Sequence, residues 1–317
     1  MSTVSRVVQR FEDSPLVERQ DASLLLVLPG LFFFSAFMFF PMLYLLGISF
    51  TNARPSNLFA GGSFLTFGQA QLVGFENYVA ILTDPAFWNS FGVTWLYVAT
   101  SVVLKICLGL LIALVVTGKR VRGKRWMRAL IILPMGLPAI FTVTVWRGIF
   151  TSAQFGLANQ LLGTFGVEAV AWLQQRWLAF FAYNVTEMWL AYPFMVIITV
   201  SALQDVDSNL HDAAMVDGAG YFARLRHITL PSIKRPVLFA SILTAAASFQ
   251  QFLIPYVFNE GGPGRTNELL IVYGFREAFA LSRYGQGAAI MVVTVLFIGV
   301  FMWLNVKKGR LADGVDK

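Results

Sequence analysis

Long runs of hydrophobic residues, separated by shorter polar segments, dominate the chain. A helix rises about 1.5 Å per residue, so about 20 apolar residues cross a bilayer core of about 30 Å. Six runs reach that length, and they cover residues 22–50, 91–116, 127–150, 178–203, 236–258 and 288–306. The pattern therefore predicts an all-α membrane protein with six transmembrane helices.

The six runs differ in how cleanly apolar they are. The run at 127–150 contains Pro134 and Pro138, and the run at 236–258 is interrupted by polar residues. Such interruptions suit helices that line a cavity better than helices that face lipid on all sides. The run at 22–50 is too long for the apolar region of a signal peptide and is followed by no small-residue cleavage site, so we expect a retained helix.

The composition supports a membrane location. Hydrophobic residues make up 57% of the 317 positions, charged residues only 13%, and the mean hydropathy is +0.66. A soluble domain needs about twice that share of charge to cover its surface. The composition therefore argues against an ordinary soluble enzyme.

The net charge of +7 is explained by topology. If the six spans alternate, 17 of the 24 Lys and Arg residues lie on one side, in segments 1–21, 118–128, 204–235 and 307–317, against five on the other. Because cytoplasmic loops carry the excess of basic residues, both termini are predicted to be cytoplasmic. No nucleic-acid partner is needed to account for the positive charge.

Residues that would indicate other chemistry are scarce. Cys107 lies in an apolar run, where we expect a small buried residue, and neither His211 nor His227 belongs to an H-E-x-x-H motif. An intramembrane hydrolase would need a nucleophile and a base within the spans, which makes that class the less favoured alternative. On the outer side, we expect short amphipathic helices at Gln154–Gly163 and Glu168–Gln175.

The segment 204–235 is too long and too patterned to be a simple connector. We expect a helix whose N-cap is Asp207 or Ser208, a turn at Gly218, and a second helix that ends at Pro231. The second helix carries an apolar stripe, formed by Phe222, Leu225 and Ile228. The pattern predicts a cytoplasmic helix pair with an apolar contact face.

The same segment resembles a known family. Asp212-Ala213-Ala214, three residues, Gly218, nine residues and then Ile228-x-Leu230-Pro231 are similar to the EAA loop of ABC-importer permeases, which usually has Glu in place of Asp212. Further similarity to maltose-type sugar permeases covers about residues 24–310 and includes 75–78, 189–194, 202–204 and 261–263. By this resemblance, the residues that couple to the ATPase are Asp212, Ala213, Ala214, Asp217, Gly218, Ala219, Leu230 and Pro231.

The resemblance implies a fold and a set of partners. The chain would be the first of two permease subunits, with a type I ABC-importer permease fold and a coupling-helix loop at 204–235. Its domains would be a cytoplasmic tail at 1–21, a permease domain at 22–306 and a cytoplasmic tail at 307–317. Its partners would be a second homologous permease, an ATPase dimer and an extracytoplasmic solute-binding protein, all at the prokaryotic inner membrane and in contact with lipid.

The resemblance also implies the cargo, which would be a sugar such as maltose, a malto-oligosaccharide or a related glycoside, moved by alternating access. Glycerol phosphate or another polyol is the alternative. No G-x-x-x-x-G-K-[ST] motif occurs in the chain. We therefore expect a transport subunit that is not itself an enzyme and binds no cofactor, with ATP and Mg²⁺ used by the partner ATPase.

Polar residues inside the spans are the candidates for the substrate path, because polar groups in a membrane are costly unless they serve a function. Aromatic rings beside amide, hydroxyl and carboxylate groups suit a sugar. The candidates on the third, fourth and fifth spans are Met135, Ala139, Asn184, Glu187, Leu190, Ala191, Phe194, Ser248, Gln250 and Gln251. Hydrogen bonding between helices is the alternative role for the polar members of this set.

Two lone charges inside the spans form a separate hypothesis. Counted from the inner ends of their helices, Lys105 and Glu187 differ in depth by roughly 6 Å, which is within the reach of a lysine side chain. They are therefore predicted to form an ion pair. The alternatives are that Lys105 extends toward the interface, or that Glu187 faces a wet cavity. Arg147 lies near the outer end of its span and is interpreted as an interfacial anchor.

Overall fold

The computed structural model describes residues 19–60, 66–118 and 121–308, and within them the chain forms helices joined by turns, with one isolated antiparallel bridge between Thr51 and Leu72. Each of the six apolar runs coincides with helices. They are α2, η1 and α3 (Arg19–Phe34, Ser35–Phe39, Phe40–Ser49), α6 (Pro85–Thr117), α7 and α8 (Lys124–Gly136, Ala139–Ile149), α10 (Arg176–Gln204), α13 and α14 (Leu230–Phe249, Leu253–Asn259), and α16 (Tyr284–Lys308).

Four of these helical stretches are long and apolar enough to cross a membrane, and the count rises to six if each bent pair is one span. The α7–α8 pair bends by 96° and the pair formed by α13 and α14 by 41°. The first bend falls where Gly136 ends α7 and Pro138 precedes α8. Pro138 therefore marks the break, because proline cannot continue the hydrogen-bonded ladder, whereas Pro134 lies within α7.

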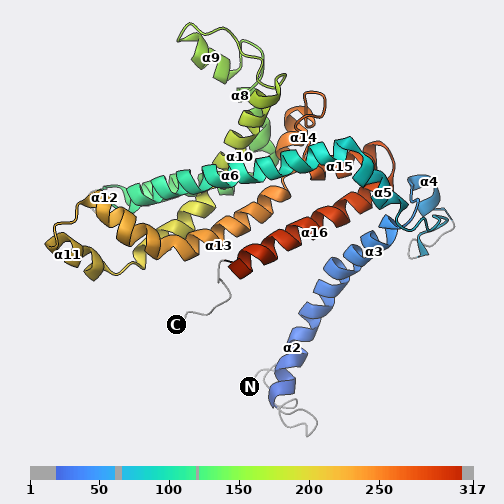
Figure 1. The fold of residues 1–317 in the computed structure, drawn as a ribbon, viewed down its shortest axis with the longest axis horizontal. Helices are drawn as coiled ribbons and strands as arrows, with labels where there is room; N and C mark the ends of the chain where they lie inside the picture. Colours follow the sequence, from blue (N-terminus) through green and yellow to red (C-terminus); the bar gives the residue numbers. More distant parts are fainter. Residues whose placement is uncertain (1–18, 61–65, 119–120, 309–317) are drawn as a thin grey trace, which may run out of the picture.

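Helices α6, α10, α13 and α16 run side by side and form the centre of the molecule (Figure 1). The short helices α11 (Ser208–Val216) and α12 (Tyr221–Arg224) lie at one end of this bundle, and α4, α5 and α15 lie at the other. Helix α3 packs on α16, whereas α2 leaves the bundle (Figure 1). The arrangement places the 204–235 segment at one extremity of the bundle.

The largest core cluster fills the space between α6, α8, α10 and α14. It includes the fully buried rings of Tyr97, Tyr183 and Phe258, which come from α6, α10 and α14. The ring of Tyr183 packs edge-on against Phe258. Close packing of this kind holds the N-terminal half of α10 and helix α14 against α6.

The start of α6 is fixed by its own sequence and by a contact from far along the chain. Asp84 is the N-cap, its Oδ1 accepts the N–H of Ala86 at 2.9 Å, and Pro85 occupies the first turn. Both features are typical of a helix N-terminus. The hydroxyl of Tyr273, on α15 (Leu270–Phe275), donates to Oδ2 of Asp84 at 2.8 Å. The cap therefore also ties α15 to α6.

The connections from α3 to α6, from α8 to α10 and from α14 to α16 contain four further short helical stretches: α4 (Pro55–Leu58), α5 (Glu76–Thr83), α9 (Leu157–Gly163) and η4 (Arg276–Ala280). Helix α9 lies within the predicted helix at 154–163. The predicted helix at 168–175 is wrong, because that segment forms turns. Asn159 explains the difference: its Oδ1 accepts the N–H of Val170 and the Nε1–H of Trp172, which ties the segment to α9 in a non-helical path.

Two further expectations need comment. Cys107 is exposed on α6, so the prediction of a buried residue is wrong; apolar sequence alone does not distinguish a helix face turned inward from one turned outward. Of the two predicted tails, residues 1–18 and 309–317 lie outside the described residues.

Candidate functional site

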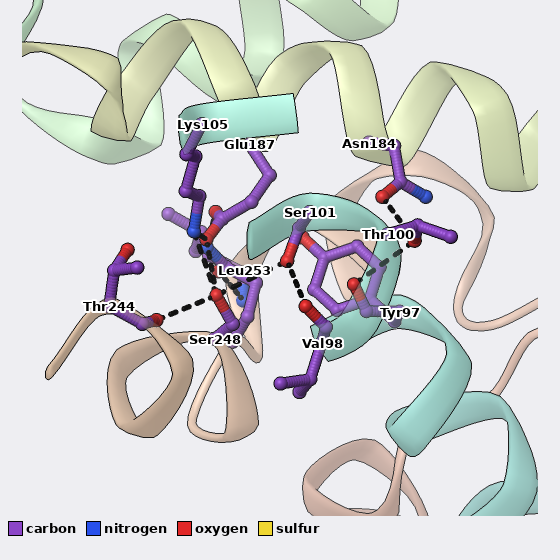
Figure 2. A network of polar contacts seen from close by, with 11 residues as sticks. Tyr97, Val98, Thr100, Ser101, Lys105, Asn184, Glu187, Thr244, Ser248 and Leu253 are labelled. Atoms are coloured by element: carbon purple, nitrogen blue, oxygen red, sulfur yellow. Dashed lines mark hydrogen bonds and ion pairs between the residues drawn. The ribbon is translucent and has the colours of Figure 1, made fainter. Parts of the chain in front are cut away.

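A network of polar side chains lies inside the bundle, where α6, α10 and α13 meet (Figure 2). Lys105 Nζ donates to Glu187 Oε1 at 2.5 Å and to Ser248 Oγ at 2.7 Å. The side chain of Lys105 is 0% exposed and that of Glu187 is 5% exposed. The two charges that the sequence placed at similar depth thus form a buried ion pair, and a hydroxyl from a third helix takes part.

The second carboxylate oxygen of Glu187 is also occupied. Gln251 Nε2 donates to Glu187 Oε2 at 2.5 Å, and Gln251 Oε1 accepts the N–H of Leu253 at 3.2 Å. The Ser248 hydroxyl is within hydrogen-bond distance of Glu187 Oε1 at 3.2 Å and of the Thr244 carbonyl at 2.9 Å. Every oxygen of the carboxylate therefore has a partner, which is what a buried charge requires.

Charge balance is the main electrostatic property of this network. One ammonium and one carboxylate neutralise each other, and the remaining members are hydroxyls and an amide. Removing one charge would leave the other buried without compensation, which is strongly destabilising. The network can therefore present amide and hydroxyl groups to a neutral ligand but carries no spare charge for an ion.

Asn184 is bonded to its helix neighbours. Thr100 Oγ1, on α6, donates to Asn184 Oδ1 at 2.8 Å, and Asn184 Nδ2 donates to the Phe180 carbonyl at 2.9 Å. Asn184 is 3% exposed. Figure 2 shows the Thr100–Asn184 contact beside the ion pair rather than within it. In this structure the Asn184 amide therefore joins α10 to α6 by a hydrogen bond, which is the alternative role given above for the polar residues of the spans.

The other predicted path residues are partly or fully exposed. Leu190, Ala191 and Phe194 are partly exposed on α10, and Met135 and Ala139 are exposed at the bend between α7 and α8. Helix α7 packs against α10. Gln250 is exposed and, within the described residues, makes no side-chain hydrogen bond, unlike its neighbour Gln251. Arg147 is exposed on α8.

Two buried residues of α6 beside the ion pair were not predicted from the sequence. Ser101 donates to Ser248 Oγ at 3.3 Å, and the fully buried hydroxyl of Tyr97 has no hydrogen-bond partner within the described residues. Tyr97, Ser101 and Lys105 are spaced by four residues, so they share one face of α6. That spacing was the signal available in the sequence.

The predicted coupling loop forms an exposed helix pair at the end of the bundle. Asp207 is the N-cap of α11, with its Oδ1 accepting the N–H of Asn209 at 2.9 Å. Gly218 makes the turn with a φ of +79°, a conformation that residues with a Cβ resist. Asp212, Ala213, Asp217 and Gly218 are exposed, Ala214 and Ala219 are partly exposed, and no residue of α11 is buried.

The second helix of this loop does not end at Pro231, so that prediction is wrong. Helix α12, the π-helical turn η3 (Leu225–Thr229) and α13 follow one another without a break. Pro231 lies in the first turn of α13. Proline has no N–H to donate, and the wider turn of η3 just before it lets the helix continue without that hydrogen bond. Leu230 and Pro231 are both exposed on this continuous helix.

Within the described residues, no three His, Cys, Asp or Glu side chains come together in a metal-binding arrangement. The polar groups gathered at the site are a buried ion pair, hydroxyls and an amide. These groups bind and orient polar ligands by hydrogen bonding.

Residues 105–306 match the family model described as "Binding-protein-dependent transport system inner membrane component". The trehalose/maltose transport system permease protein MalF of Thermococcus litoralis is 34% identical over 238 residues, which is 75% of this chain and 80% of that protein. The galactooligosaccharides permease GanP of Bacillus subtilis is 28% identical, over 87% of this chain and 67% of that protein. The diacetylchitobiose uptake permease DasB of Streptomyces coelicolor is 33% identical, over 74% and 75%.

Solved structures agree on the fold. A chain of a bacterial alginate ABC transporter, crystallised with an alginate pentasaccharide-bound periplasmic protein, superimposes with a TM-score of 0.72 at 20% identity and covers 92% of this chain and 95% of its own length. The match extends over nearly the whole chain. The fold is therefore that of type I ABC-importer permeases.

Proposed function

Because the chain belongs to the family of binding-protein-dependent transport system inner membrane components, we propose that it is the permease subunit of an ATP-driven importer for a neutral saccharide. The relatives at 28–34% identity are named for trehalose and maltose, galactooligosaccharides, diacetylchitobiose and sulfoquinovosyl glycerol, all of which are glycosides. The sugar class is the feature that these relatives share.

The observation that carries this proposal is the position of the polar network. Glu187 lies on α10 and Ser248 on α13, the two helices that flank the exposed α11 segment, and Gln251 follows α13 directly. A ligand that bonds these groups would be linked through continuous helices to the loop that meets the ATPase. Leu190, Ala191, Phe194, Met135 and Ala139 would supply the apolar walls on which sugar rings pack.

Charge balance favours a neutral solute over an anionic one. A phosphate ester would call for several cationic groups that converge on it. Lys105 already pairs with Glu187, and Arg147 is exposed on α8. Glycerol phosphate is therefore the weaker candidate.

The proposed topology has six spans, with the α7–α8 and α13–α14 pairs each counted as one span, and both termini in the cytoplasm. The distribution of basic residues supports it. In this topology α11 lies on the cytoplasmic side, where Asp212, Ala213, Ala214 and the Gly218 turn would dock into an ATPase subunit. The permease domain would be residues 22–306, flanked by cytoplasmic tails at 1–21 and 307–317.

The proposed complex contains a second homologous permease, two ATPase subunits that bind ATP and Mg²⁺, and an extracytoplasmic binding protein that delivers the sugar. ATP-driven closure of the ATPase pair would move α11 and, through α12 and α13, alternate the access of the path. This chain would bind the sugar and couple its movement to the ATPase subunits, which would hydrolyse ATP.

Reconstitution tests the proposal. The chain is co-expressed with a second permease, an ATPase and a binding protein of its own cell, the complex is placed in liposomes, and ATP hydrolysis is measured against a panel of saccharides, glycerol phosphate and amino acids. We expect stimulation by one or a few neutral saccharides and accumulation of that sugar inside the vesicles. Stimulation by glycerol phosphate or an amino acid alone, or a chain that copurifies with no ATPase, would refute it.

A further inference from the structure

The break between α13 and α14 has a physical cause and a distinct side-chain environment. Helix α13 ends at Phe249, α14 begins at Leu253, and their axes differ by 41°. Pro255 has no N–H to donate to the carbonyl of Gln251, four residues earlier, so the helical ladder is interrupted there. Gln250 and Gln251 lie in the interruption.

Gln251 ties this break to the neighbouring helix. Its Oε1 accepts the N–H of Leu253, the first residue of α14, while its Nε2 donates to Glu187 Oε2 on α10 at 2.5 Å. One side chain thus bonds the first N–H of α14 and connects it to a buried carboxylate. Gln250, in the same break, is exposed and makes no side-chain hydrogen bond among the described residues.

The ion pair also holds the other side of the break. Ser248, in the last turn of α13, accepts from Lys105 Nζ at 2.7 Å and lies 3.2 Å from Glu187 Oε1. Figure 2 shows Lys105, Glu187 and Ser248 converging from α6, α10 and α13, with Leu253 adjacent. A bend that is bonded on both sides to the same ion pair is held at one angle, whereas an unsupported break between two helices would flex.

Movement at the far end of α13 would reach this point directly. The Gly218 turn, α12, η3 and α13 follow in one connected path, and no loop separates α12 from Ser248. A displacement of α11 is therefore carried along a stiff helix to its last turn. For α13 to move relative to α10, the contacts of Ser248 and Gln251 with Glu187 have to break or rotate together.

We propose that the Lys105–Glu187 ion pair is a latch that fixes the bend between α13 and α14, with Gln251 as the releasable contact. Lys105 holds the carboxylate of Glu187 in place, and Gln251 occupies the Glu187 oxygen that a sugar hydroxyl would otherwise use. A sugar that takes this oxygen frees the bend, which lets α13 follow α11. Lys105 and Gln251 are positioning residues in this scheme, which rests on the proposed transport function.

A distance measurement in the purified full-length chain tests the latch without any sugar. Val103 on α6 and Phe239 on α13 are exposed. In a Cys107→Ser background, both are changed to cysteine and spin-labelled, the chain is placed in lipid nanodiscs, and the distance distribution is recorded by pulsed electron resonance. We expect one narrow peak for the parent and a broadened or shifted distribution for Gln251→Leu.

Two variants make this result specific. Gln250→Leu is the matched control, since it makes the same change one position away, and we expect the parent distribution. Lys105→Met combined with Glu187→Gln removes the ion pair and the Lys105–Ser248 contact without leaving an unpaired charge, so we expect it to broaden the distribution as Gln251→Leu does. An unchanged distribution in Gln251→Leu, or equal broadening in Gln250→Leu, would overturn the proposal.

ATP hydrolysis by the reconstituted complex provides a second readout. Releasing a hydrogen bond to a charged group shifts the equilibrium by about tenfold, which corresponds to ~1.4 kcal/mol. We expect Gln251→Leu to raise sugar-independent hydrolysis by up to about that factor and to reduce further stimulation by sugar. If no sugar stimulates the parent complex, the proposed function fails, while the distance result still decides whether the latch exists. Basal hydrolysis equal to the parent in Gln251→Leu would overturn the coupling role.

Discussion

Lys105 and Glu187 lie 82 positions apart in the chain, yet Nζ of one is 2.5 Å from Oε1 of the other in the interior of the bundle. We expect Lys105→Met to leave a buried carboxylate without its counter-charge, at a cost of about 3–5 kcal/mol. The measurement is the yield and thermal unfolding midpoint of the purified chain in detergent.

The double variant Lys105→Met with Glu187→Gln is the control for this first prediction. It removes the charge imbalance and retains an amide that can bond Ser248 and Gln251, so its unfolding midpoint should recover most of the loss. Equal destabilisation in the single and double variants would mean that the ion pair contributes nothing beyond packing.

Gly109 on α6 allows the close approach of α10. A Cβ added at Gly109 would lie 2.7 Å from the Cβ of Met195 and 3.3 Å from its carbonyl carbon, so the two helices would have to separate. We expect Gly109→Ala to destabilise the chain by about 1–3 kcal/mol through overpacking. Gly92→Ala on the same helix meets no atom within 4 Å and should be neutral or slightly stabilising. Comparable unfolding midpoints for the two variants would contradict the prediction.

The Gly218 turn offers a sharp test of ATPase docking. A residue with a Cβ in the left-handed region costs about 1–2 kcal/mol, and Gly218 has a φ of +79°. We expect Gly218→Val to change the geometry of α11 and weaken copurification with the ATPase, while Gly218→Asn retains it because Asn tolerates this region.

Gly220 is the matched control, since its φ is −69° and an added Cβ meets nothing within 4 Å, as at Gly218. Gly220→Val should therefore copurify with the ATPase as the parent does. Equal loss of the ATPase in both valine variants would show that bulk in the loop, rather than backbone conformation, is responsible.

The positions of the spans follow from hydropathy, because any helix that crosses the bilayer core must be apolar over about 20 residues. The depth argument also brings Lys105 and Glu187 together, since the rise per residue is fixed. The sequence does not tell which face of α6 meets which face of α13. For that reason Ser248 and Gln251 as further partners of Glu187 emerged only from the structure.

Two local features of the structure could not be predicted from the sequence pattern. Pro231 was interpreted as a helix end. Instead, a π-helical turn at 225–229 lets the helix continue although Pro231 has no N–H to donate. Cys107 looked buried because both the core face and the outer face of α6 are apolar. Both features depend on tertiary contacts, which the spacing of apolar residues in a single sequence does not reveal.

The contact of Tyr273 with Asp84 predicts how stability depends on alkaline pH. The Tyr273 hydroxyl is buried and donates to Asp84 Oδ2 at 2.8 Å; burial, followed by this hydrogen bond, raises the pKa of Tyr273 well above its ordinary value of about 10. Above pH 10 the unfolded chain therefore loses this proton while the folded chain keeps it. Stability must then fall as pH rises, because the folded state binds more protons.

Tyr273→Phe isolates this contribution. At neutral pH the variant lacks a hydrogen bond to a carboxylate and should be less stable by about 1.5–3 kcal/mol. Between pH 10 and about 12 the parent should lose stability faster than the variant, so the gap between their unfolding midpoints narrows. Tyr221→Phe, which alters an exposed ring on α12, should leave the pH slope of the parent unchanged. A gap that stays constant or widens with rising pH would show that Tyr273 does not retain its proton in the folded chain.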